Sequence, residues 1–112
     1  MNRKLVIRAD ADSRMGTGHV MRCLALAQAW KDRGGSVTFL SICENEFLRN
    51  KIIDEGFTII PFESHHPDAS DLKATLDELH GNGEWLVLDG YHFSPEYQKA
   101  IKDAGFHLLV ID

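Results

Sequence analysis

The most informative stretch for the fold is Gly16-Thr17-Gly18-His19-Val20-Met21-Arg22-Cys23. It follows Leu5-Val6-Ile7, an apolar run typical of a strand that is covered on both faces of a sheet. It leads directly into apolar residues at helical spacing. A glycine-rich turn between a first strand and a first helix is where α/β proteins place ligand chemistry. We therefore expect an α/β domain with His19 at the start of its first helix.

Apolar runs typical of strands alternate with helical patterns along the rest of the 112 residues. The pattern predicts strands at residues 5–7, 37–42, 57–61, 85–88 and 108–111. A helix is predicted after each of the first four strands; the first ends at Gly34-Gly35, and the fourth begins after an N-cap at Ser94. Such alternation produces right-handed βαβ units. The sequence therefore predicts a Rossmann-like, doubly wound parallel sheet with the strand order 3-2-1-4-5.

Composition and charge exclude several classes of protein. The net charge of −5 argues against a general nucleic-acid binder, which needs a basic face. No apolar run approaches the roughly 18 residues of a membrane span. The first residues lead into a strand without a secretory signal pattern. Cys23 and Cys43 lack CxxC spacing, so neither a disulfide nor a zinc site is predicted. We expect a cytoplasmic domain that binds no nucleic acid, membrane or metal.

The glycine turn does not match the common phosphate-binding motifs. A dinucleotide fingerprint needs a small residue where this chain has Met21, and no Gly-Lys-Ser/Thr of a P-loop follows. His19 is the more informative residue, because a helix N-terminus disfavours positive charge and so favours the neutral imidazole that a general base needs. A tight turn with a capping or packing histidine is the alternative interpretation.

Two acidic residues, Asp10 and Asp12, follow the first strand. Paired carboxylates there could bind magnesium, as in receiver-type signalling domains. Such domains also need an aspartate after the third strand, where this chain has Pro61-Phe62. We therefore expect Asp10 to brace the glycine loop through backbone N–H groups.

The segment Asp89-Gly90-Tyr91-His92 follows the fourth predicted strand. In a doubly wound sheet the loops after strands one and four flank the switch point, where ligands bind. His19 and the segment 89–91 should therefore face one crevice, although an Asp-Gly turn with a surface tyrosine is the simpler alternative. His65 and His66 lie in a polar loop and are expected to be solvated. Because the chain stops beside this crevice, we expect it to be one domain of a longer polypeptide.

Three patterns in order, Arg8-x-Asp10, Gly16-x-Gly18-His19-x-x-Arg22 and Asp89-x-Tyr91, resemble the nucleotide-sugar hydrolases of pseudaminic acid biosynthesis and related spore-coat polysaccharide proteins. The resemblance spans essentially the whole chain. It implies a GT-B-like enzyme of two Rossmann-like domains with the active site between them. Residues 1–112 would be the N-terminal domain, which carries the base. The C-terminal domain, which binds most of the UDP, would be absent from this chain.

The resemblance also implies roles for single residues. His19 would be the catalytic base of an inverting, metal-independent hydrolysis of a UDP-linked diacetamido-trideoxy sugar, with no cofactor. The substrate-binding residues would be Gly16, Gly18, Arg22, Asp89 and Tyr91, and the loop-supporting residues Arg8 and Asp10. One departure is Gly90, where family members often carry a larger residue. Two alternatives remain open: a glycosyltransferase of the peptidoglycan UDP-GlcNAc transferase type, and a non-catalytic nucleotide-binding module.

Overall fold

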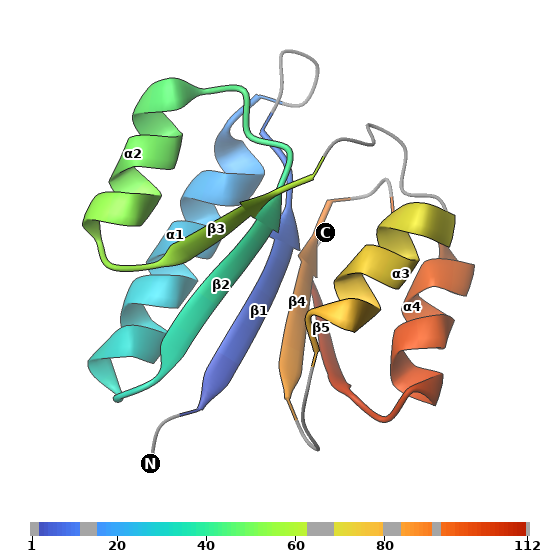
Figure 1. The fold of residues 1–112 in the computed structure, drawn as a ribbon. Helices are drawn as coiled ribbons and strands as arrows, with labels where there is room; N and C mark the ends of the chain where they lie inside the picture. Colours follow the sequence, from blue (N-terminus) through green and yellow to red (C-terminus); the bar gives the residue numbers. More distant parts are fainter. Residues whose placement is uncertain (1–2, 12–15, 63–68, 80–83, 91–92, 112) are drawn as a thin grey trace.

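The computed structural model describes residues 3–11, 16–62, 69–79, 84–90 and 93–111. Strands and helices alternate along these ranges (Figure 1). The strands are β1 (Lys4–Ala9), β2 (Ser36–Ser41), β3 (Thr58–Pro61), β4 (Trp85–Asp89) and β5 (His107–Ile111). The helices are α1 (Gly18–Asp32), α2 (Glu46–Asp54), α3 (Ala69–Asp77) and α4 (Pro95–Asp103).

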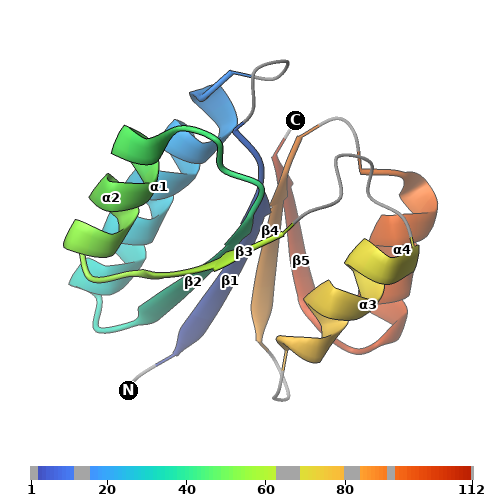
Figure 2. The ribbon, with the colours of Figure 1, turned by 45° about the horizontal axis from the view of Figure 1, so that its top comes forward.

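All strands pair in parallel in the order β3-β2-β1-β4-β5. This result confirms the predicted fold class and strand order. Helices α1 and α2 cover one face of the sheet, and α3 and α4 cover the other (Figure 2). The order reverses between β1 and β4, so the carboxyl ends of these two central strands form the switch point of the sheet.

Side chains alternate between two cores along the central strands. Leu5 and Ile7 of β1 and Val87 of β4 belong to the core under α1 and α2. Val6 and Leu88 belong to the core under α3 and α4. Because successive strand residues point to opposite faces, the apolar character of β1 is continuous rather than alternating.

Local signals fix the ends of the helices. Gly34 adopts a φ of +90° just after α1, which ends this helix as predicted. The side chain of Asn45 accepts a hydrogen bond from Leu48 N at 2.9 Å and caps α2. Ser94 Oγ accepts one from Tyr97 N at 3.1 Å and caps α4. Within the described ranges, no helix is both long and apolar enough to span a bilayer.

Candidate functional site

His19 and Asp89 meet at the switch point although 70 positions separate them. Asp89 is the last residue of β4 and lies two positions after Val87, so it points toward α1. His19 is the second residue of α1. Its Nδ1 lies 2.7 Å from Asp89 Oδ1, and its side chain is 13% exposed. The structure thus brings together the two segments that the strand order places at one edge.

Arg22 joins this pair from the next turn of α1, on the same face of the helix as His19. Its Nε donates to Asp89 Oδ2 at 2.5 Å, and its Nη2 donates to Asp89 Oδ1. Two parallel N–H···O bonds of this kind form the strong, bidentate arginine–carboxylate pair. The same Nη2 lies 3.2 Å from His19 Nδ1, and the side chain is 43% exposed.

Asp89 is fully buried, and its carboxylate is held in the ionised form. Burial raises the pKa of Asp89, but hydrogen bonds from Arg22, then His19 and Cys23, and the charge of Arg22 outweigh burial and leave it below its ordinary value. Cys23 Sγ lies 3.3 Å from Asp89 Oδ2. Burial, with the nearby charge of Asp89, raises the pKa of the Cys23 thiol. The thiol therefore stays protonated and donates to the carboxylate.

This arrangement selects one tautomer of His19. An ionised carboxylate can only accept hydrogen bonds, so the imidazole atom that faces Asp89 carries the proton. That atom is Nδ1, and the lone pair of the neutral ring therefore resides on Nε2. An imidazole oriented in this way by a buried carboxylate is suited to accept a proton at Nε2.

The backbone favours glycine at two of the three loop positions. Gly16 has a φ of +72° and Gly90 a φ of +146°, both of which disfavour other residues. Gly90 therefore matches the backbone that follows β4. Gly18 needs no such conformation, and the space where its Cβ would lie is open. Tyr91 lies outside the described residues, as do Asp12, His65 and His66.

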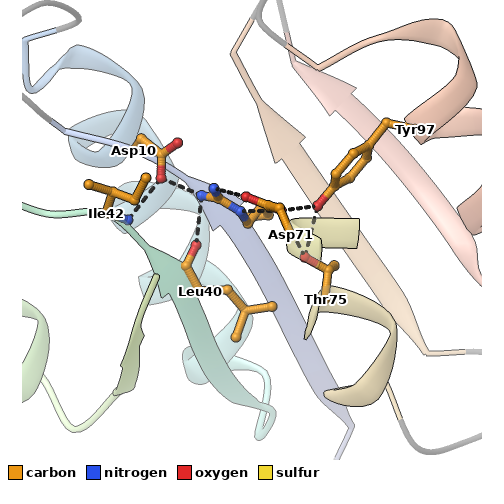
Figure 3. A network of polar contacts seen from close by, with 7 residues as sticks. Asp10, Leu40, Ile42, Asp71, Thr75 and Tyr97 are labelled. Carbon is orange, nitrogen blue, oxygen red and sulfur yellow. Dashed lines mark hydrogen bonds and ion pairs between the residues drawn. The ribbon is translucent and has the colours of Figure 1, made fainter. Parts of the chain in front are cut away.

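Arg8 and Asp10 belong to a second polar network on the α3 and α4 face of the sheet (Figure 3). Arg8 is fully buried and forms a bidentate pair with Asp71 of α3, with Nε–Oδ1 3.3 Å and Nη2–Oδ2 2.6 Å. Its Nη1 contacts Asp10 Oδ1 and donates to the carbonyl of Leu40 at 3.3 Å. The network therefore ties β1 and β2 to α3.

Helix α4 completes this network. The hydroxyl of Tyr97 donates to Asp71 Oδ1 at 2.6 Å and lies 2.8 Å from Thr75 Oγ1. Sequence reasoning missed Asp71, Thr75 and Tyr97. A signal for them was present, since an arginine inside a buried apolar strand requires an acidic partner from the helices above it.

Asp10 connects the ends of β1 and β2. Its Oδ1 accepts from Ile42 N at 2.8 Å. Ala11 N donates to the Ile42 carbonyl, and Glu44 N to the Ala11 carbonyl, both at 2.8 Å. The chain entering the glycine loop is thus fixed to the segment that follows β2. Residues 12–15 lie outside the described part, so direct bracing of the glycine loop by Asp10 stays a prediction.

Among the described residues, no three His, Cys, Asp or Glu side chains are grouped so that they could hold a metal ion.

One curated protein aligns with almost the entire chain. It is UDP-2,4-diacetamido-2,4,6-trideoxy-beta-L-altropyranose hydrolase from Campylobacter jejuni, 28% identical over 111 residues. The alignment covers 97% of this chain and 36% of the hydrolase, so the chain spans about a third of that protein's length. No family model and no solved structure matches the chain. The alignment confirms the resemblance that the three sequence patterns indicate.

Proposed function

We propose that residues 1–112 form the part of a UDP-sugar hydrolase that supplies the catalytic base. The observation that carries the proposal is the contact between His19 Nδ1 and the buried Asp89 carboxylate at the switch point. The similarity to a protein named as the hydrolase of a UDP-linked diacetamido-trideoxy sugar supports the same reaction. We extend the proposal to the same class of sugar, so that the reaction would be a step in pseudaminic acid-type glycan synthesis.

In the proposed reaction Nε2 of His19 accepts a proton from water. The water oxygen forms a bond to the anomeric carbon while the bond from that carbon to the UDP oxygen breaks. UDP leaves with the electron pair of that bond, and the free sugar carries the new hydroxyl. Attack opposite the leaving group inverts the anomeric configuration. Backbone N–H groups at the start of α1, beside Gly16 and Gly18, would meet the charge of the diphosphate.

The proposal includes a second Rossmann-like domain, C-terminal to this one, in a GT-B arrangement. The chain spans only 36% of the hydrolase that it resembles, which supports a longer polypeptide. The active site would then lie between the domains, with His19 at the carboxyl edge of the first sheet. The second domain would bind most of the UDP.

Replacement of His19 in the full-length protein tests the assignment of the base. We expect His19→Gln to reduce the rate of UDP release by about 10²–10⁴-fold, the usual contribution of a general base. His107→Gln serves as the matched control, because His107 is exposed at the opposite end of the sheet, where β5 begins. His19→Gln turnover within a few-fold of the wild type would contradict the proposal.

The same assay separates hydrolysis from glycosyl transfer. With the UDP-sugar as the only substrate, a hydrolase releases UDP and free sugar in equal amounts. A glycosyltransferase would instead use His19 to deprotonate an acceptor hydroxyl, and UDP release would depend on added acceptor. A strict acceptor requirement would replace the hydrolase proposal with the transferase alternative.

A further inference from the structure

We propose that Asp89 and Arg22 are positioning residues, which together set the tautomer and the charge of His19, rather than contacts to the substrate. This inference rests on the proposed function, because it assigns their roles through the base. It changes the roles that the sequence resemblance implies for both residues, which are substrate binding.

Asp89 is too enclosed to bind a substrate. Its side chain is 0% exposed, and both carboxylate oxygens already accept hydrogen bonds. Oδ1 faces His19 Nδ1 and Arg22 Nη2, while Oδ2 accepts from Arg22 Nε and Cys23 Sγ. A buried ionised carboxylate persists only where such partners compensate for lost hydration. Asp89 therefore holds the imidazole of His19 in place, and its own oxygens are occupied by hydrogen bonds.

Arg22 has a separate effect on the charge of the ring. A carboxylate beside an imidazole favours the protonated imidazolium, which cannot act as a base. The guanidinium of Arg22 balances the charge of Asp89, and its Nη2 lies 3.2 Å from Nδ1, where a positive charge opposes a second proton on the ring. Asp89 thus fixes where the ring proton resides, and Arg22 balances the negative charge of Asp89 beside the ring.

The groups that face His19 in the described part of the chain fit this division. Asp89 of β4 and Arg22 of α1 contact the ring, and Cys23 of α1 contacts Asp89. The thiol of Cys23 is protonated and therefore adds no charge of its own. Within this set the charges next to the ring are one negative and one positive, and they act on its protonation in opposite directions.

The opposite signs give a decisive kinetic test on the full-length protein with the UDP-sugar. The pH dependence of kcat/KM is measured for the wild type, Arg22→Gln and Asp89→Asn. In Arg22→Gln the acidic limb should move to higher pH, because the positive charge beside the ring is lost. In Asp89→Asn the limb should move to lower pH, and kcat should fall by about 10²–10⁴-fold at every pH with little change in KM.

Arg22→Lys is the conservative control, because it keeps the positive charge and loses the fork of donors. It should return the acidic limb toward its wild-type position. A limb that stays in place in Arg22→Gln, or a rise in KM without a change in kcat, would overturn the inference in favour of substrate contact. If His19→Gln were also active, the proposed function itself would fail; an inactive His19→Gln beside a fully active Asp89→Asn would refute only this inference.

A spectroscopic measurement keeps the test independent of turnover and of the folding of any Asp89 variant. In full-length protein labelled with ¹⁵N-histidine, the ring nitrogen shifts report the tautomer, and the spectrum of His19→Gln identifies the His19 signals. We expect the Nδ1–H form of His19 at neutral pH in the wild type. Observation of the Nε2–H form would overturn the proposed role of Asp89.

Discussion

Among single residues, Ser41 carries a buried hydroxyl that forms no hydrogen bond within the described structure. It is the last residue of β2, it is 1% exposed, and its Oγ has no hydrogen-bond partner among the described residues. A buried hydroxyl without a partner loses hydration and gains nothing in return. We therefore expect Ser41→Ala to raise the free energy of unfolding by about 1 kcal/mol. Urea denaturation of the wild type and the variant measures this difference.

Ser94 provides the matched control for the same substitution. Its Oγ accepts a hydrogen bond from Tyr97 N at the N-terminus of α4. Ser94→Ala should therefore lower the free energy of unfolding by about 1 kcal/mol, the usual effect of removing an N-cap. Losses of equal size at both serines would show that the Ser41 hydroxyl does have a partner.

The lowered pKa of Asp89 predicts a specific pH dependence of stability. A carboxyl whose folded pKa lies below its unfolded value of about 3.9 stabilises the fold above that value. This contribution is lost as the pH falls through the lower, folded pKa. The advantage of the wild type over Asp89→Asn should therefore shrink as the pH falls below about 5, as measured by urea denaturation at each pH. An advantage that stays constant over this range would contradict the ion pairing of Asp89 with Arg22.

Among the secondary structure elements, α3 depends on one buried ion pair. Asp71 binds the guanidinium of Arg8 through two hydrogen bonds and accepts a third from Tyr97. Asp71→Ala removes a carboxylate that compensates the buried guanidinium, and we expect a loss of about 3–5 kcal/mol in the free energy of unfolding. Asp77→Ala on the same helix is the control, because Asp77 is exposed and pairs only with exposed Lys73 in the described structure. It should change stability by less than about 1 kcal/mol.

The strands could be predicted from the sequence because each is an apolar run ended by a glycine, a proline or a polar loop. The predicted and observed bounds differ by at most a residue or two, as for 85–88 against Trp85–Asp89. The partners of Arg8 could not be predicted in this way. Asp71 lies 63 positions away, and its inward direction depends on how α3 rests on the sheet, which helical periodicity alone does not determine.

For the candidate site, as for the fold, the sequence predicted which segments lie together but not their side-chain contacts. Strand order placed His19 and the residues after β4 at one edge, whereas Arg22 was singled out only by the family resemblance. The burial of Asp89 was not predicted; in the structure Asp89 lies two residues after the buried Val87, on the same face of β4. Its bonds to Arg22 and Cys23 depend on the contact between α1 and β4, which only the structure gives.

For the molecule as a whole, the charge distribution indicates which domain of the proposed enzyme binds the diphosphate. The domain carries a net charge of −5, which repels a diphosphate. Arg8 and Arg22, which lie near the carboxyl edge of the sheet, both pair with carboxylates. In the proposed enzyme this domain would therefore supply the base and the loop amides. The positive charge that a nucleoside diphosphate requires would come from the second domain of the proposed enzyme.

Calorimetric titration with UDP tests this assignment when the affinity of residues 1–112 alone is compared with that of the full-length protein. We expect the isolated domain to bind UDP at least about 100-fold more weakly, which corresponds to about 2.7 kcal/mol, and to release no UDP from the UDP-sugar. A cooperative urea transition of residues 1–112 must first show that the isolated domain folds, so that weak binding reflects the missing partner rather than unfolding. Micromolar affinity for UDP in the isolated domain would instead place the nucleotide site on this half, beside His19 and the glycine loop.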